Sequence, residues 1–290
     1  MTAPAPPHVG RLVLVGHPVA HSLSPRFQNA ALRAAGLALA YEAVDVPPAA
    51  LGPTFEALGA EWGAGNVTVP HKEAVADRCG RLTPLADSVG AVNTFWHDAA
   101  GWLVGDNTDV GGFDEAARAV VAPDAAAQRV ALVGAGGSAA AVVAAVAAWP
   151  GASLTVWSRT PARARALASR LPQRARAGAT LAAALDGATL VVNATPLGLD
   201  PADPFAVPIA ALPDGCAVLD LVYAADRTPW VRAAAAEGHP AADGLTMLVA
   251  QGALAFRRWF GREADREAMW AALADVTARR SGRAARDAGA

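Results

Sequence analysis

A short apolar segment, a glycine-rich turn and an alanine-rich segment follow one another from Arg129 onward. Residues 129–133 (Arg-Val-Ala-Leu-Val) have the composition of a buried strand, and the glycines within residues 134–137 lead directly into a predicted helix. Glycine permits a tight turn there and lets a pyrophosphate approach the helix N-terminus closely. A second strand is predicted at Ser153–Trp157, where a βαβ unit requires one. This order of elements predicts a parallel α/β domain that binds a dinucleotide.

The residues after this second strand indicate which dinucleotide is bound. A site for NAD carries an Asp or Glu there, which contacts the ribose hydroxyls. This chain instead has Ser158, Arg159 and Thr160. A guanidinium can pair with a 2′-phosphate and stack on adenine, whereas a carboxylate would repel that phosphate. The pattern therefore predicts NADP, although Arg163 and Arg165 just beyond are equally explained as a solvated helix face.

A polar residue interrupts the apolar face of a helix predicted from Gly244 to about Trp259. Met247, Gln251 and Leu254 are spaced by four and three residues, which places them on one face. A buried amide needs hydrogen-bond partners from the protein or from a ligand. Gln251 is therefore a candidate binding residue.

The first hundred residues also alternate between strand and helix patterns. Strands are predicted at residues 11–16 and 41–46, and a third strand that contains Asn66 is predicted to end at residues 67–69, followed by a hairpin over residues 90–105. Ser24 has the chemistry of an N-cap, because a proline suited to the first helical position follows it. The alternation predicts an α/β unit with a largely parallel sheet.

Polar residues gather at the end of the third predicted strand. Asn66 and Thr68 would share one face of that strand. Pro70 ends the strand and can open a helix, which places Lys72 near the positive end of a helix dipole, where a cation is disfavoured. A solvated lysine and a functional lysine explain this position equally well. Asp109 has two interpretations as well, a carboxylate that complements a helix dipole or a site residue.

The composition excludes several classes of protein. A chain of 290 residues, 53% hydrophobic and 17% charged, is long enough for two domains with buried cores. A net charge of −2 predicts no nucleic-acid partner, and no apolar run is long enough to predict a membrane span or a signal peptide. Cys79 and Cys216 match no metal-ligand spacing and are expected to be reduced thiols. These features predict a cytoplasmic protein without a metal site.

Taken in order, the motifs resemble those of the shikimate dehydrogenase family over nearly the whole chain, from about residue 12 to about residue 260. The matching motifs are Ser22-Leu-Ser24, Asn66–Lys72, Gly90–Thr94, Asn107–Asp109, Gly134–Gly137, Asn193–Pro196, Asp220–Tyr223 and Gly244–Gln251. The resemblance implies an α/β fold with an N-terminal substrate domain (residues 1–109), a Rossmann-type NADP-binding domain (110–243) and C-terminal helices that return to the first domain (244–290). It implies an active site in the cleft between the domains.

The resemblance also implies roles for individual residues. Lys72 and Asp109 would be the catalytic pair. The residues that would bind shikimate or 3-dehydroshikimate are Ser22, Ser24, Thr68, Asn93, Tyr223 and Gln251. The residues that would bind NADP are Gly134, Ala135, Gly136, Gly137, Ser138, Ala139, Ser158, Arg159, Thr160, Thr195, Gly244 and Met247. The implied activity is the reversible NADP-dependent reduction of 3-dehydroshikimate to shikimate, in the biosynthesis of chorismate and aromatic amino acids, by a monomer or homodimer.

One departure from the family pattern bears on specificity. Ser158 stands where the family usually has asparagine, but Arg159 is kept. Members that prefer NAD and accept quinate tend to have an acidic residue in this region and a threonine in place of Ser24, and this chain has neither. Quinate is therefore the second candidate substrate. A non-catalytic NADP-binding sensor would be expected to lose the lysine or the aspartate, and a methylene-tetrahydrofolate-type dehydrogenase lacks the polar substrate set.

Overall fold

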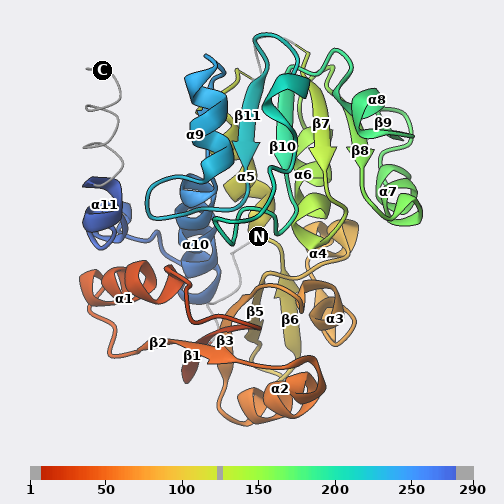
Figure 1. The fold of residues 1–290 in the computed structure, drawn as a ribbon. Helices are drawn as coiled ribbons and strands as arrows, with labels where there is room; N and C mark the ends of the chain where they lie inside the picture. Colours follow the sequence, from red (N-terminus) through yellow and green to blue (C-terminus); the bar gives the residue numbers. More distant parts are fainter. Residues whose placement is uncertain (1–7, 123–126, 279–290) are drawn as a thin grey trace. The chain divides into compact units, whose positions relative to one another are not determined.

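The structure, a computed structural model, describes residues 8–122 and 127–278, which form two compact units (Figure 1). The first unit runs to Asp109 and includes Leu248–Ala274. The second consists of the described residues of Val110–Met247 together with residues 275–278. Each unit has its own six-stranded sheet. The segment from Leu248 thus belongs to the unit formed by the N-terminal third of the chain.

The first unit has a mixed sheet with the strand order β2-β1-β3-β5-β6-β4. Its strands are β1 (Arg11–Gly16), β2 (Tyr41–Asp45), β3 (Gly63–Val67), β4 (Arg81–Leu82), β5 (Thr94–His97) and β6 (Leu103–Asp106). β1 is parallel to β2 and β3, whereas β5 is antiparallel to both β3 and β6. The predicted hairpin is β5–β6, and its turn is held by the Asp98 carboxylate, which accepts the backbone N–H groups of Ala100 and Trp102.

Helices cover this sheet because their apolar residues recur at helical spacing. The helical elements are α1 (Ser24–Ala34), the 3₁₀-helix η1 (Pro48–Ala50), α2 (Leu51–Ala60), α3 (Lys72–Ala76), α4 (Pro84–Val89), α10 (Leu245–Phe260) and α11 (Arg266–Ala271). On α2, for example, Leu51, Phe55 and Leu58 are buried in the same core as Val13 and Phe95. This spacing is what stabilises a helix of only ten residues.

The end of β3 differs from the prediction. The strand stops at Val67, so Thr68 lies beyond it, and α3 spans Lys72–Ala76, whereas the sequence predicts a helix from residue 71 to about residue 79. Thr68 leaves the pairing with β5, although its N–H still donates to the carbonyl of Val15 in β1 (2.8 Å). The predicted continuation of the strand to residue 69 is therefore wrong, whereas the shared face of Asn66 and Thr68 stays a prediction.

The helix α10 is anchored to the first unit at three points. The Trp259 Nε1 donates to the carbonyl of Phe95 (3.2 Å), and Gln28 Nε2 donates to the carbonyl of Gly252 (2.9 Å). Arg258 pairs with the buried carboxylate of Asp106 at 2.6 Å. Packing at Gly252 is close, because a Cβ there would lie 2.4 Å from the Phe27 ring.

The second unit has an all-parallel sheet with the strand order β12-β11-β10-β7-β8-β9 (Figure 1). Its strands are β7 (Arg129–Val133), β8 (Ser153–Trp157), β9 (Ala175–Ala177), β10 (Leu190–Asn193), β11 (Ala217–Asp220) and β12 (Ala241–Ala242). Its helical elements are α5 (Asp109–Ala117), α6 (Gly137–Ala147), α7 (Pro161–Ala168), α8 (Leu181–Leu185), the 3₁₀-helix η2 (Ile209–Ala211) and α9 (Pro229–Ala236). This is the Rossmann strand order, with its switch point between β7 and β10. The predicted α/β fold is confirmed, and none of the described helices has the length and apolarity that a membrane span requires.

We expect the substitution Gly252→Ala to lower the free energy of unfolding by about 1–3 kcal/mol, because the added methyl group overlaps the Phe27 ring. Gly52→Ala in α2 is the matched control. A Cβ at Gly52 meets nothing within 4 Å, so alanine there should raise stability by about 0.5–1 kcal/mol. Urea denaturation of the three proteins measures both effects. Equal changes in the two variants would contradict the proposed overlap.

Candidate functional site

The segments that carry candidate residues in the first unit lie at one end of the sheet's strands, the edge at which β1 and β3 terminate. β1 and β3 are parallel and end there, β5 is antiparallel to β3 and begins there, and β6 ends there beside the start of β5. Backbone hydrogen bonds continue the pairing: the N–H of Val67 donates to the carbonyl of Asn93 at 2.8 Å. Segments distant in the sequence are therefore held side by side at this edge.

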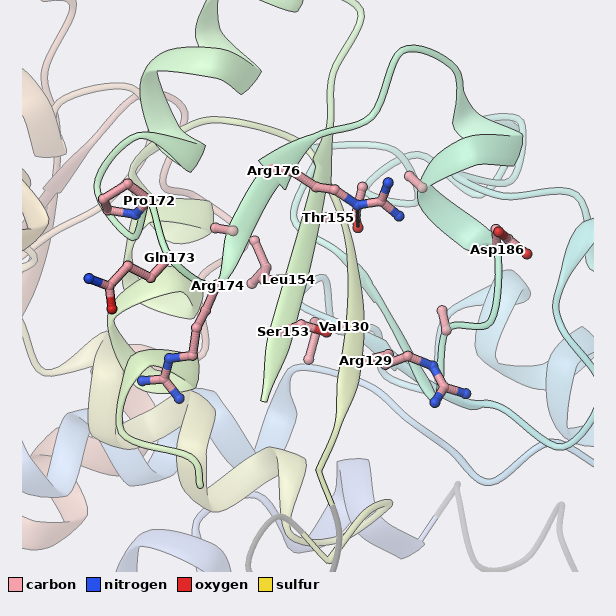
Figure 2. Close-up of a pocket in the computed structure, with 13 residues that line it drawn as sticks. Arg129, Val130, Ser153, Leu154, Thr155, Pro172, Gln173, Arg174, Arg176 and Asp186 are labelled. Carbon is pink, nitrogen blue, oxygen red and sulfur yellow. Dashed lines mark hydrogen bonds between the residues drawn. The ribbon is translucent and has the colours of Figure 1, made fainter. Parts of the chain in front are cut away.

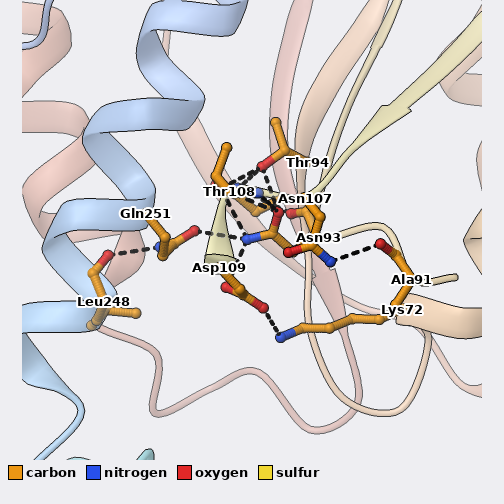
Figure 3. Close-up of polar contacts among 10 residues, drawn as sticks. Lys72, Ala91, Asn93, Thr94, Asn107, Thr108, Asp109, Leu248 and Gln251 are labelled. Carbon is orange, nitrogen blue, oxygen red and sulfur yellow. Dashed lines mark hydrogen bonds and ion pairs between the residues drawn. The ribbon is translucent and has the colours of Figure 1, made fainter. Parts of the chain in front are cut away.

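Lys72 and Asp109 form an ion pair at this edge (Figure 3). Lys72 Nζ donates to Asp109 Oδ2 at 2.5 Å, and the two side chains are only 12% and 6% exposed. The backbone of α3 is fixed nearby, because the ring of buried His71 lies 2.6 Å from the carbonyl of Val46. Attraction between opposite charges strengthens as water is excluded. The interpretation of Lys72 as a solvated lysine is therefore wrong.

The Asn93 amide links this pair to α10 (Figure 3). Asn93 Nδ2 donates to Asp109 Oδ1 at 2.7 Å and to Gln251 Oε1 at 3.2 Å. Gln251 Nε2 in turn donates to the carbonyl of Leu248 (2.7 Å). The protein itself thus supplies partners for the buried amide of Gln251. Each carboxylate oxygen of Asp109 has its own donor, Lys72 for Oδ2 and Asn93 for Oδ1.

The candidate Ser24 differs from the prediction in how it meets α1. Leu23 is the N-cap residue, without a side-chain cap, and Ser24 is already inside the helix, so Ser24 is not the predicted cap. Instead, Ser22 Oγ accepts the N–H of Ser24 at 3.2 Å. The candidate Thr68 is partly buried and lies against Gly16, where a Cβ would come within 2.3 Å of its methyl group.

Sequence reasoning missed two threonines that contact Asn93. Thr94 Oγ1 donates to Asn93 Oδ1 at 3.0 Å, and the Thr108 N–H donates to the same oxygen at 2.7 Å. Thr94 directly follows Asn93 and Thr108 directly precedes Asp109. This adjacency to predicted site residues is the sequence feature that could have identified them.

In the second unit, the glycine-rich turn lies at the carboxyl end of β7. Gly134 has a φ of +118°, and a Cβ there would be 2.7 Å from the carbonyl oxygen of Ala194. Gly136, the N-cap of α6, supplies no side-chain acceptor, and a Cβ added to it would meet nothing within 4 Å. A helix N-terminus of this kind, with open space beside it, suits a phosphate group.

The other predicted cofactor residues follow the neighbouring strands at the same carboxyl edge. The Gly134 N–H donates to the carbonyl of Trp157 (2.8 Å), directly before the candidates Ser158, Arg159 and Thr160. Across β7, the Ala194 N–H donates to the carbonyl of Val133 (2.8 Å), directly before Thr195. Arg159 is exposed. The structure therefore brings these candidates together with the glycine turn.

The remaining candidates of the second unit lie after β11 and β12. Tyr223 is half-buried, and Met247 is buried on α10. The Gly244 N–H donates to the carbonyl of Val222, and a Cβ on Gly244 would lie 2.3 Å from the carbonyl oxygen of Leu221. Glycine is thus required at residue 244 for backbone packing.

Asp220 is a buried carboxylate that supports these loops. It accepts hydrogen bonds from Asn193 Nδ2 (2.8 Å), the Val222 N–H (3.0 Å) and Thr228 Oγ1 (2.7 Å). Burial raises the pKa of Asp220 to about 6 in spite of these donors. Asn193 also accepts the N–H of Thr195 (2.9 Å), so this pair holds the loops that carry Thr195 and Tyr223.

A hollow of about 310 Å³ lies at the opposite, amino-terminal ends of β7 and β8 (Figure 2). Three arginines line it, and each donates to a neighbouring oxygen: Arg129 to the carbonyl of Gly187, Arg174 to the carbonyl of Trp149, and Arg176 to the Thr155 hydroxyl. Because dinucleotides bind at the carboxyl ends of parallel strands, this hollow is not the candidate cofactor site.

The described residues contain no group of three or more His, Cys, Asp or Glu side chains that could hold a metal ion. Burial raises the pKa of Cys79 to about 12 and that of Cys216 to about 11, which keeps both thiols protonated near neutral pH. These two thiols are therefore poor nucleophiles and poor metal ligands.

Comparison with known proteins identifies the family. The family model for the shikimate dehydrogenase substrate binding domain matches residues 14–95, and that for the shikimate 5′-dehydrogenase C-terminal domain matches residues 244–274. The shikimate dehydrogenase (NADP(+)) of Rubrobacter xylanophilus is 44% identical over 269 residues, which cover 90% of this chain and 94% of that protein. The chain belongs to the shikimate dehydrogenase family. It is accordingly an oxidoreductase.

Solved structures of shikimate dehydrogenases share the fold. The enzyme from Aquifex aeolicus matches with a TM-score of 0.84 at 32% identity, covering 91% of this chain and 97% of that one. The enzyme from Thermus thermophilus, in complex with NADP(H) and shikimate, matches with a TM-score of 0.80 at 39% identity and covers 92% of this chain and 99% of that one.

The raised pKa of Asp220 predicts a pH-dependent stability. Between about pH 4 and pH 6 the native carboxyl holds a proton that the unfolded chain releases, so its contribution to the unfolding free energy falls as the pH rises. The fall should total about 3 kcal/mol and should level off above pH 6. Asp220→Asn mimics the neutral carboxyl group, so the stability of this variant should not fall between pH 4 and pH 6 for this reason. Urea denaturation of both proteins from pH 4 to pH 7 tests it, and parallel stability curves would contradict it.

Proposed function

We propose that this chain catalyses the reversible reduction of 3-dehydroshikimate to shikimate with NADPH. The observation that carries the proposal is the ion pair of Lys72 with Asp109, buried beside Asn93 at the sheet edge. Relatives named shikimate dehydrogenase (NADP(+)) support both the substrate and the cofactor. In this proposal the reaction serves the biosynthesis of chorismate and aromatic amino acids.

The chemistry explains why such a pair is needed. Hydride transfer to a ring ketone builds negative charge on the carbonyl oxygen, and a proton or a cation must neutralise it. Lys72 would donate that proton, and it would accept it again when the alcohol is oxidised. Asp109 would hold the ammonium group in place. Asn93, Gln251, Ser22, Ser24, Thr68 and Tyr223 would bind the hydroxyl and carboxylate groups of the substrate.

The use of lysine and arginine in this chain supports a proton-transfer role for residue 72. Of the 24 lysine and arginine residues, 23 are arginine, and Lys72 is the only lysine. A guanidinium stays protonated in proteins, whereas an ammonium group can release a proton. A chain built almost wholly with arginine thus has its single lysine where a proton must move. This supports Lys72 as the group that transfers the proton.

The cofactor is NADP, and the residues of the second unit fit it. The open N-terminus of α6 suits the pyrophosphate, and no carboxylate directly follows β8 to repel a 2′-phosphate. Arg159 would pair with that phosphate, with Ser158 and Thr160 beside it. The turn from Gly134 to Ala139, Thr195, Gly244 and Met247 would complete the site. When bound, NADPH supplies the hydride.

Replacing Lys72 tests the catalytic assignment. Lys72→Ala should lower kcat about a hundred- to ten-thousandfold, because it removes the proton donor, with only a modest change in the KM for shikimate. Lys72→Arg keeps a cation but cannot transfer the proton, so it should recover little of the lost rate. Following NADPH formation from shikimate and NADP⁺ measures both variants. Near-wild-type turnover of Lys72→Ala would refute the assignment, and rescue by arginine would leave Lys72 only an electrostatic role.

Arg159→Ala tests the 2′-phosphate contact. The variant should raise the KM for NADP⁺ at least about tenfold and leave the weaker use of NAD⁺ nearly unchanged, because only NADP⁺ carries the phosphate. Arg163→Ala, an exposed arginine on α7, is the matched control and should change neither value. An equal rise in the KM for NADP⁺ and for NAD⁺ would contradict the assignment of Arg159 to the 2′-phosphate.

The same assay with quinate in place of shikimate, and with NAD⁺ in place of NADP⁺, separates the alternatives. Turnover of quinate at a comparable kcat/KM would indicate a shikimate/quinate dehydrogenase of broader specificity. Absence of turnover with every pair would favour a non-catalytic NADP-binding sensor. Monomer or homodimer assembly and a cytoplasmic location stay predictions.

A further inference from the structure

A line of buried hydrogen bonds crosses the first unit and ends on Asp109. The Tyr41 hydroxyl donates to Asn66 Oδ1 at 2.8 Å, and Asn66 Nδ2 donates to Thr94 Oγ1 at 3.0 Å. Thr94 Oγ1 donates to Asn93 Oδ1 at 3.0 Å, and Asn93 Nδ2 donates to Asp109 Oδ1 at 2.7 Å. Tyr41, Asn66, Thr94 and Asn93 are all at most 4% exposed. Figure 3 shows the half of this line from Thr94 to Lys72.

Backbone groups fix the orientation of both amides in this line. The Thr108 N–H can only donate, and it lies 2.7 Å from Asn93 Oδ1, so the nitrogen of Asn93 faces Asp109. The carbonyl of Asn93 can only accept, and it lies 3.1 Å from Asn66 Nδ2. The nitrogen of Asn66 therefore faces Thr94, and its oxygen faces Tyr41.

The direction of the hydroxyl groups follows from these two amides. Tyr41 meets an amide oxygen of Asn66 and donates to it. Thr94 accepts a hydrogen bond from Asn66 Nδ2, and its single hydroxyl proton has two acceptors at 3.0 Å, Asn93 Oδ1 and Thr108 Oγ1. Thr108 Oγ1 itself donates to Asn93 Oδ1 at 3.1 Å, so the Thr94 hydroxyl is directed to Asn93 either directly or through Thr108. All four donors thus point the same way, toward the Asp109 carboxylate.

An aligned series of donors in a buried setting polarises each member, which strengthens the final hydrogen bond to the anion. That final bond holds Asp109 Oδ1 and leaves Oδ2 to Lys72. Neither Tyr41 nor Thr94 has a role of its own in the proposed reaction, yet both are connected to its acid/base pair.

We propose that Thr94 and Tyr41 are positioning residues, which act through Asn66 and Asn93 to hold the Asp109 carboxylate in line with Lys72. The inference rests on the proposed function. A purely structural role is the alternative, in which the hydrogen bonds stabilise the fold and do not affect the chemical step. The two roles make different predictions for the rate of hydride transfer in folded enzyme.

Thr94→Val is the central test, because valine has nearly the shape of threonine but cannot donate or accept. We expect kcat with shikimate and NADP⁺ to fall about tenfold, the effect of losing a hydrogen bond in a network that ends on a charged group. The primary deuterium isotope effect on kcat, measured with shikimate deuterated at the carbon that loses hydride, should increase, because the chemical step becomes slower relative to product release. Thr94→Ser restores the hydroxyl and should restore both values.

Tyr41→Phe provides a second variant at the far end of the line. It should change kcat and the isotope effect in the same direction, by less than Thr94→Val. Trp230→Phe is the matched control, because it also removes a buried donor, the Nε1–H that meets the carbonyl of Val207 at 2.8 Å, but in the second unit. Its loss of stability should leave the isotope effect unchanged, since partial unfolding lowers only the amount of active enzyme.

The outcomes separate this inference from the proposed function. An active wild type together with an unchanged isotope effect in both Thr94→Val and Tyr41→Phe overturns the inference alone. Failure of serine to rescue the loss at residue 94 also overturns it. A wild type that turns over no shikimate with NADP⁺ overturns the proposed function and the inference together.

Discussion

The ion pair between Lys72 and Asp109 is the interaction on which the candidate site depends. Two charges that are almost withdrawn from water are costly unless further hydrogen bonds satisfy them. The N-terminus of α3 adds to the cost, because a helix dipole disfavours a cation there. The negative charge of Asp109 offsets both the cost of burying Lys72 and the cost of placing a cation at a helix N-terminus. Asn93 donates a hydrogen bond to the second oxygen of the Asp109 carboxylate. The sheet edge is what holds these three side chains in reach of one another.

Both units use the same local device at the edge of a sheet. In the first unit, the oxygen of Asn93 accepts the backbone N–H of Thr108 in a neighbouring loop. In the second, the oxygen of Asn193 accepts the N–H of Thr195, while its nitrogen donates to the buried Asp220. An amide can donate and accept at once, so it can fix a loop while it contacts a second group. This dual capacity explains why an asparagine is buried at each of these two positions, Asn93 directly before β5 and Asn193 at the end of β10.

The chemical difference between lysine and arginine matches the two tasks of the proposed reaction, proton transfer and binding of the cofactor phosphate. Arginine suits the recognition of a phosphate, because its charge is permanent and its donors form a planar fork. Arg159 has that role in the proposal, at the end of β8. A proton donor needs the opposite property, a charge that can be lost. Among its 24 lysine and arginine residues the chain has one lysine, and that lysine lies against Asp109.

Local composition and periodicity were enough to predict the α/β class, the β5–β6 hairpin and the glycine turn after β7. They did not determine that β3 stops at Val67, that Ser22 rather than Ser24 accepts a backbone N–H at α1, or that Thr94 contacts Asn93. Tertiary structure decided these points, because they depend on which segments meet. The contact of Asn93 with Gln251 joins residues 158 positions apart, and no local pattern encodes a contact of that range.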